Sequence, residues 1–274
     1  MPGANARALE KARELPADAL ILDLEDAVAP EAKAEARARV CEAAASGAYG
    51  QRLVTIRVNG LATEWHDADL AAAAAAGPDA VLVPKVDRAD DVLTVERALE
   101  RAGAPAATQI WAMLETPAAI LHADEIAGAS RRLRTLVMGT NDLLNELRAE
   151  AMQGRRSLQT SLALCLLAAR AEGRMILDGV YNDVRDAEGF EAECVEGRRL
   201  GFDGKTLIHP GQIEICNRVF SPSAQEVDHA RRVIEAFEQA SRGGAGVATL
   251  DGRLIENLHV ENARRVLGMD GAST

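Results

Sequence analysis

Short apolar runs rich in β-branched residues alternate with Ala-rich stretches along the chain, and this alternation limits the possible folds more than any other feature. The apolar runs are continuous, as in parallel strands that are buried on both faces. They recur about every 25 to 40 residues, which is the length of a strand, a crossover helix and their loops. We expect seven strands, at 19–24, 53–58, 80–83, 109–114, 135–138, 175–177 and 204–208.

Helices are expected between these strands, at 4–15, 32–45, 68–76, 89–102, 117–127, 157–171 and 187–200. This order predicts an α/β fold, a TIM (β/α)8 barrel. A doubly wound open sheet is the alternative, although no G-x-G-x-x-G motif follows any predicted strand. A closed barrel needs one more strand before the helix at 4–15. Only Met1-Pro2-Gly3 precedes that helix, so we expect a barrel whose first strand is largely missing.

The end of the chain has a different pattern. Ser223 and Glu226 have the spacing of a capping box, which typically starts a helix. This helix carries an apolar stripe, and a hairpin-like stretch at 247–254 and a last helix at 260–267 follow it. We expect the barrel to span 1–220 and a C-terminal helical appendage to span 221–274. The stripe would pack on the barrel's own wall or on a neighbouring subunit.

Composition excludes several classes of protein. Acidic residues outnumber basic ones 42 to 31, and the net charge of −11 argues against nucleic acid or an anionic membrane as a partner. The sequence has no run of 18 apolar residues and no signal-peptide pattern behind Met1, so we expect no membrane span. The cysteines match no zinc-binding spacing, which indicates reduced thiols in a cytoplasmic protein. They are Cys41, Cys165, Cys194 and Cys216.

Polar residues that directly follow the strands are the candidates for an active site, because TIM barrels place it at the carboxyl ends of their strands. Glu115 and Asp142 follow two neighbouring strands. Two carboxylates, completed by water or backbone oxygens, are a typical Mg²⁺ site. Alternatively, each carboxylate caps the helix that follows it. Pro117 suits the first position of a helix and so keeps Glu115 at the strand end.

Positive charge is expected at the same end of the barrel, from Arg57 and Lys85. The guanidinium fork of Arg57 suits a carboxylate or a carbonyl oxygen of a substrate. The alternative is a salt bridge from Arg57 to Glu25 or Asp26, which would also orient the arginine. Asp23 faces the same side of its strand as Glu25. We therefore regard these three acids and Lys85 as supporting residues.

The remaining motifs are less informative. His209-Pro210-x-Gln212 is expected to fix the loop before a helix rather than to act in catalysis. No H-x-H, H-E-x-x-H or G-x-S-x-G motif is present, which argues against zinc and serine hydrolases.

Taken in order, the motifs resemble the citrate lyase beta-subunit-like group of the HpcH/HpaI aldolase superfamily. The resemblance covers about 2–267 and rests on LDLEDAV at 22–28, RVNG at 57–60, PKV at 84–86, ET at 115–116, GTNDL at 139–143 and GFDGKTLIHP at 201–210. It implies a TIM barrel that forms a homotrimer or hexamer. It also implies Mg²⁺ on Glu115 and Asp142, with Arg57 and Glu115 contacting a CoA thioester substrate.

The resemblance implies a carbon–carbon lyase that cleaves malyl-CoA, citramalyl-CoA or a citryl thioester by a retro-Claisen reaction. The segments 137–143, 178–182 and 255–259 are also similar to bacterial malyl-CoA thioesterases, which hydrolyse the thioester. Glu256 stands where lyases of the group carry a catalytic aspartate. Glutamate is one methylene longer than aspartate and would misplace a proton relay tuned for aspartate, which favours the thioesterase. Alternatively, Glu256 faces solvent. A third alternative is a non-catalytic or carrier-dependent subunit of a larger lyase complex.

Overall fold

The structure, a computed structural model, describes residues 1–272. Tertiary contacts divide the chain into two units, Met1–Cys216 and Asn217–Thr274. The expected division at 220/221 falls at the end of helix α10 (Ile213–Phe220), which crosses from one unit to the next.

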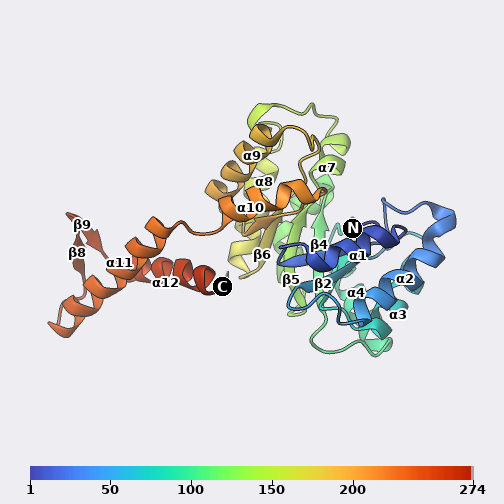
Figure 1. Cartoon of the computed structure of the whole chain (residues 1–274), viewed down its shortest axis with the longest axis horizontal. Helices are drawn as coiled ribbons and strands as arrows, with labels where there is room; N and C mark the ends of the chain where they lie inside the picture. Colours follow the sequence, from blue (N-terminus) through green and yellow to red (C-terminus); the bar gives the residue numbers. More distant parts are fainter. Residues whose placement is uncertain (273–274) are drawn as a thin grey trace. The chain divides into compact units, whose positions relative to one another are not determined.

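The first unit is built on a sheet of parallel strands that pair in chain order and curl into a half-barrel (Figure 1). This order, without the reversal of an open doubly wound sheet, confirms the TIM-barrel-like fold. The strands are β1 (Ala19–Asp23), β2 (Leu53–Arg57), β3 (Ala80–Val83), β4 (Gln109–Leu114), β5 (Leu133–Met138), β6 (Met175–Asp178) and β7 (Gly204–Lys205). The predicted strand at 204–208 is therefore too long.

Residues 1–3 lie beside β1, at the place of the expected first strand. Pro2 forms a single parallel bridge with Asp23, and the Gly3 N–H donates to the Asp23 carbonyl at 2.8 Å. A Cβ atom on Gly3 would lie 2.6 Å from that carbonyl oxygen, so the close approach requires glycine.

Helices surround the sheet and pack in sequence, α2 against α3, α3 against α4, α4 against α6 and α6 against α8. The helices are α1 (Ala6–Lys11), α2 (Lys33–Ala45), α3 (His66–Ala76), α4 (Ala89–Arg101), α5 (Pro117–Leu121), α6 (Ala123–Gly128), α7 (Thr140–Glu146), α8 (Gln159–Ala171), α9 (Ala187–Leu200) and α10. Short 3-10 turns lie at Ala12–Glu14, Pro30–Ala32, Gln153–Arg155 and Pro210–Gln212.

Three helix predictions need correction. The predicted helix 117–127 is two helices, because His122 has a non-helical ψ of 16°. The predicted helix 4–15 ends at Lys11 and continues as a 3-10 turn. Helix α7 was expected only in the alternative in which Asp142 caps a helix, and it starts at Thr140, before Asp142.

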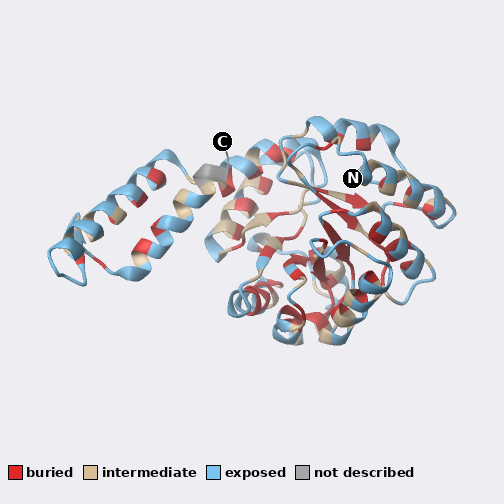
Figure 2. Ribbon diagram, turned by 90° about the horizontal axis from the view of Figure 1, so that it is seen from below, coloured by how far each residue is buried: buried red, intermediate tan, exposed pale blue. Residues whose placement is uncertain are grey.

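The core lies on both faces of the sheet, as the continuous apolar runs predicted. Ala80, Leu82, Trp111, Met113 and Val137 form a cluster of their own, while strand residues such as Leu22 and Ile56 are fully buried. Figure 2 shows this burial concentrated in the strands and on one face of the helices. Burying each large aliphatic side chain contributes about 1.5–3 kcal/mol, so the strand ends are held by a rigid support.

The second unit consists of α11 (Ala224–Arg242), an antiparallel hairpin of β8 (Ala248–Leu250) and β9 (Arg253–Ile255), and α12 (Asn257–Ala272). The expected capping box of Ser223 and Glu226 starts α11. Ala230 and Val233 of α11 pack against Ile255 and Val260 within the unit. The apolar stripe thus has a partner inside its own unit. Within residues 1–272, every helix is too short or too polar to cross a lipid bilayer.

Candidate active site

The candidate residues of the first unit gather at the carboxyl ends of β1 to β5. Asp23 ends β1 and is paired in register with Arg57 at the end of β2. Lys85 follows β3, Glu115 follows β4, and Asp142 lies in the first turn of α7 after β5. Because these strands are parallel neighbours, their ends bring together side chains that are far apart in the sequence.

Arg57 is held by two acidic side chains. Its Nε and Nη2 atoms donate to the two carboxylate oxygens of Asp23 at 2.5 and 2.7 Å, and its Nη1 lies 2.8 Å from Oε2 of Glu25. The predicted bridge to Glu25 is therefore present. The other partner is Asp23, whereas the predicted alternative, Asp26, is exposed. Asp23 faces Arg57 because both side chains point to the same face of paired strands.

Burial and charge shift the pKa values of this group in opposite directions. Burial disfavours ionisation of Asp23, but hydrogen bonds and charge from Arg57 outweigh it and lower the pKa. Burial raises the pKa of Glu25, and the charge of Arg57 offsets this only in part. Burial would lower the pKa of Arg57, yet the two carboxylates raise it. Arg57 is thus permanently cationic, and only the N–H groups left over on Nη1 and Nη2 can reach a substrate.

Lys85 connects Glu115 with Asp142. Its backbone N–H donates to Oε1 of Glu115 at 2.8 Å, and its ammonium donates to Oδ1 of Asp142 at 2.9 Å. Lys85 has a left-handed φ of 52°, a conformation that costs a non-glycine residue on the order of 1 kcal/mol. Neither carboxylate caps a helix. Thr116 caps α5 with its hydroxyl, and α7 follows Gly139 without a side-chain cap.

Glycine at position 139 makes room for Glu115. A Cβ atom there would lie 2.3 Å from Cβ of Glu115 and 2.4 Å from its Oε2. These distances are far shorter than a normal contact of about 3.5–4.0 Å between carbon atoms. The carboxylate therefore lies directly against the backbone that leads from β5 into α7.

The electrostatics of this group favour a cation. Burial raises the pKa of Glu115 to about 7, and the charges of Asp142 and Glu25 add to this, while Lys85 lowers it. The Arg57 guanidinium contacts Asp23 and Glu25, and the Lys85 ammonium contacts Asp142. Glu115 accepts from the backbone N–H of Lys85. With all four carboxylates ionised, the four negative and two positive charges would leave a formal charge of about −2, and a bound divalent cation would favour that ionised state.

The oxygen donors of Glu115 and Asp142 fit Mg²⁺, which binds proteins through one or two carboxylates and keeps several water ligands. Among residues 1–272, no three His, Cys, Asp or Glu side chains lie close enough together to hold a metal ion by themselves. A two-carboxylate site completed by water and substrate agrees with both observations. The Lys85 ammonium on Asp142 shows that the position attracts positive charge.

Sequence reasoning missed the residues that hold the segment carrying Glu25. The buried Lys33 ammonium donates to the carbonyls of Leu24 and Glu25 at 2.9 and 2.8 Å and lies 5.0 Å from the centre of the Trp65 ring. Asn59 donates to the same Leu24 carbonyl at 2.9 Å. Asn59 belongs to the RVNG motif and could have been identified from it. Lys33 has no local sequence pattern that distinguishes it.

Two other polar groups at the strand ends are structural. Asp178 at the end of β6 is fully buried and accepts from Arg155 at 2.6 Å and from Lys205 at 3.1 Å. His209 caps the turn Pro210–Gln212 and accepts from the Gly211 N–H, which confirms its loop-fixing role.

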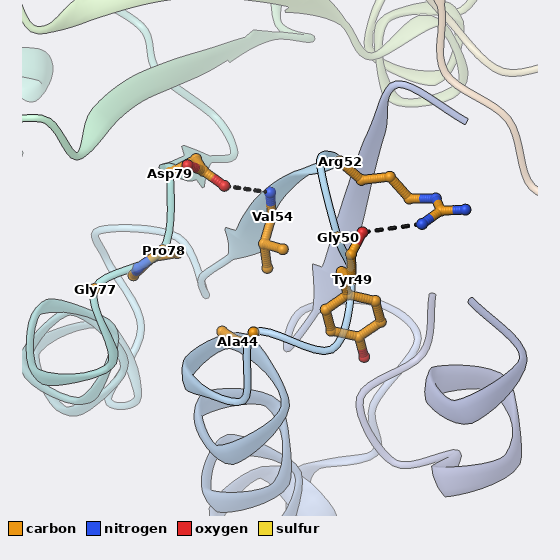
Figure 3. Close-up of a pocket in the computed structure, with 9 residues that line it drawn as sticks. Ala44, Tyr49, Gly50, Arg52, Val54, Gly77, Pro78 and Asp79 are labelled. Carbon is orange, nitrogen blue, oxygen red and sulfur yellow. Dashed lines mark hydrogen bonds between the residues drawn. The ribbon is translucent and has the colours of Figure 1, made fainter. Parts of the chain in front are cut away.

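At the opposite ends of the strands lies a small pocket of about 130 Å³, bordered by Tyr49, Arg52, Val54 and Asp79 (Figure 3). Asp79 accepts from the Val54 N–H at 2.7 Å, and Arg52 donates to the Tyr49 carbonyl at 2.9 Å. Its polar groups are thus paired with the backbone, and it lies at the amino-terminal ends of the strands, where TIM barrels do not carry their active sites.

Glu256 belongs to the second unit. It is exposed and directly precedes α12, and its backbone N–H donates to Nδ1 of His259 at 3.0 Å. Its catalytic role stays a prediction.

Comparison with known proteins decides the family. The model of the HpcH/HpaI aldolase/citrate lyase family matches residues 1–210. The chain belongs to this family. The family motifs lie where the site is: LDLEDAV and RVNG carry the Arg57 group, and PKV, ET and GTNDL carry Lys85, Glu115 and Asp142. The resemblance seen in the sequence is thereby confirmed.

Proteins named as thioesterases and proteins named as citrate lyase subunits are both similar to this chain. A (3S)-malyl-CoA thioesterase of Cereibacter sphaeroides strain KD131 is 53% identical over 97% of this chain and 91% of the relative. The citrate lyase subunit beta of Escherichia coli K12 is 40% identical over 97% of this chain and 90% of the relative. The solved structure of CitE from Mycobacterium tuberculosis, in complex with magnesium, acetoacetate and coenzyme A, is 28% identical. It aligns with a TM-score of 0.79 over 99% of this chain and 96% of that one.

Proposed function

We propose that this family member is a Mg²⁺-dependent enzyme that hydrolyses the thioester of a short 3-hydroxydicarboxyl-CoA, with malyl-CoA as its first candidate substrate. Relatives named (3S)-malyl-CoA thioesterase are 51% to 53% identical to the chain, whereas those named citrate lyase subunit beta are 34% to 40% identical. Carbon–carbon cleavage, which the sequence placed first, thus becomes the second candidate.

One structural observation supports the proposal: Glu115 and Asp142 both contact Lys85, one through its backbone N–H and one through its ammonium, at the same ends of the strands. These two residues would hold the Mg²⁺. When bound, the ion supplies a Lewis acid that polarises the acyl oxygens and a charge that lets Glu115 ionise fully.

Arg57 would bind and orient the acyl group. With Asp23 and Glu25 fixing its guanidinium, the N–H groups on Nη1 and Nη2 that these two carboxylates do not use would donate to a carboxylate or carbonyl oxygen. Fixing a substrate in this way lowers the entropic part of the reaction barrier. The contact between Nη1 and Glu25 would also place a carboxylate of raised pKa beside an acyl group bound by Arg57.

Hydrolysis adds water to the thioester carbonyl carbon and breaks the C–S bond. The attacking water must lose a proton, and the leaving thiolate must gain one. Glu25 is suited to accept that proton, because its raised pKa makes it a stronger base than an exposed glutamate. Glu256 is the other candidate for proton transfer, from the second unit.

Carbon–carbon cleavage is retained as the second candidate because of the citrate lyase relatives and the bound acetoacetate of the solved neighbour. In that reaction the 3-hydroxyl loses its proton, the C2–C3 bond breaks, and a thioester enolate leaves and is protonated. A carrier-dependent or non-catalytic subunit is the third alternative, against which the complete group of charged residues argues. A homotrimer or hexamer and a cytoplasmic location stay predictions.

Product analysis tests the proposal. The purified protein is incubated with (3S)-malyl-CoA and Mg²⁺, and malate, free CoA, glyoxylate and acetyl-CoA are separated and quantified. Malate and CoA in equal amounts are the expected result. Glyoxylate and acetyl-CoA as products would instead identify the reaction as carbon–carbon cleavage. The absence of all four products, with citramalyl-CoA and a citryl thioester also unchanged, would contradict both activities.

A further inference from the structure

Lys85 differs from Arg57 in how firmly its charged end is held. The Arg57 side chain is 18% exposed and contacts two carboxylates that are themselves buried. The Lys85 side chain is 47% exposed, and its ammonium donates to Asp142, whose side chain is 38% exposed. The Lys85–Asp142 pair can therefore separate into water at little cost, whereas the Arg57 pairs cannot.

The backbone of Lys85 is fixed while its side chain is free to move. The N–H of Lys85 holds Oε1 of Glu115 at 2.8 Å, and this contact does not depend on where the ammonium lies. The side chain can thus leave Asp142 without disturbing Glu115. The backbone contact of Lys85 with Glu115 is therefore permanent, whereas the contact of its ammonium with Asp142 can be broken and replaced.

A divalent cation and the Lys85 ammonium compete for the Asp142 carboxylate. The ammonium occupies Oδ1 of Asp142, and like charges a few ångströms apart repel strongly at a partly buried site. Binding a cation between Glu115 and Asp142 would therefore expel the ammonium from Asp142.

We propose that the Lys85 ammonium is an exchangeable internal counterion: it holds Asp142 in the metal-free protein and gives this carboxylate up when a divalent cation binds. This inference rests on the cation site of the proposed function. The ammonium keeps Asp142 in place without metal, and it weakens cation affinity because it must first be displaced.

Calorimetric titration with MgCl₂ tests the exchange at low ionic strength, in the wild type and in Lys85→Met, Lys85→Arg and Glu115→Gln. Lys85→Met keeps the backbone N–H but removes the competitor, so its Kd for Mg²⁺ should fall about two- to fivefold, the range expected for a partly exposed ion pair. Lys85→Arg should stay close to the wild type. Lys11→Met, on the exposed face of α1, is the control for the loss of one positive charge elsewhere.

Thermal unfolding gives a second readout that does not depend on activity. Without metal, Lys85→Met should melt below the wild type, because Asp142 loses its ion pair and Glu115 loses a nearby positive charge. Its gain in Tm on adding Mg²⁺ should exceed that of the wild type.

The outcomes separate the two proposals. If the wild type binds Mg²⁺, Glu115→Gln does not, and Lys85→Met binds no more tightly than the wild type, the exchange is wrong and the cation site stands. If neither the wild type nor Lys85→Met binds Mg²⁺, the cation site of the proposed function fails, and the exchange fails with it.

Discussion

Replacing Gly139 with alanine should damage the cation site without touching a charged residue. The new Cβ atom would lie 2.3 Å from Cβ of Glu115, more than an ångström closer than carbon atoms normally approach. The φ of Gly139, −96°, is open to any residue, so the effect is steric and not conformational. Glu115 is fixed by β4 on one side and by the Lys85 N–H on the other, which leaves little room for adjustment.

The expected cost follows from this overlap. Overpacking by a methyl group typically costs about 1–3 kcal/mol. Because the closest overlap is with Cβ of Glu115, relief requires the backbone at Glu115 or at position 139 to shift, which displaces the carboxylate. Because about 1.4 kcal/mol corresponds to a factor of ten, the affinity for Mg²⁺ should fall about tenfold or more. Calorimetric titration at pH 8 measures this change, and circular dichroism checks that the fold persists.

Gly60→Ala is the matched control, since a Cβ atom there meets only Cγ of Pro84 at 3.9 Å. That variant should bind Mg²⁺ as the wild type does. If Gly139→Ala also binds with wild-type affinity, the assignment of Glu115 as a cation ligand is refuted.

Further predictions concern pH, stability and individual side chains. Because the pKa of Glu115 is about 7 without metal, protons compete with Mg²⁺, so the affinity should fall up to about tenfold per pH unit below 7 and level off above about pH 8; a pH-independent Kd would contradict this. Since that pKa lies above the ordinary glutamate value of 4.5, ionised Glu115 destabilises the metal-free fold. In urea unfolding with EDTA, the free energy of unfolding of Glu115→Gln should rise relative to the wild type by up to about 3 kcal/mol between pH 4.5 and 8. A fall relative to the wild type over this range would contradict the prediction. Arg57→Ala should lower kcat/KM about 100-fold, through loss of a charge-assisted contact in a desolvated site; a change below about threefold would make Arg57 structural. Glu256→Gln should lower kcat with the Mg²⁺ affinity unchanged, and an unaltered kcat would remove Glu256 from proton transfer.

The principal members of the site could be predicted because the topology decides them. Continuous apolar runs indicate parallel strands, and parallel neighbours bring their carboxyl ends together, so Glu115, Asp142, Arg57 and Lys85 were expected at one end of the barrel. The alternation of side chains along a strand also placed Asp23 with Glu25. The sequence left open which acid pairs with Arg57, because that depends on the strand register.

Other features depend on tertiary contacts that have no local pattern. Lys33 reaches back to carbonyls eight and nine residues before it, and a lysine in a helix usually faces water. The left-handed backbone of Lys85, which aims its N–H at Glu115, is not indicated by a Pro-Lys-Val sequence. Similarly, His122 interrupts the helical stretch at 117–127 while Nδ1 of its ring lies 3.0 Å from the Asp87 carbonyl oxygen, a contact 35 residues away along the chain.

The rate of thiol release from (3S)-malyl-CoA, measured as Mg²⁺ is titrated into metal-free protein, tests the central claim most directly. A rate that is negligible in EDTA, rises to saturation with Mg²⁺ and is absent in a folded Glu115→Gln variant is the predicted result. Full thiol release in EDTA, or undiminished release by Glu115→Gln, would contradict a metal-dependent thioester hydrolase built on Glu115 and Asp142.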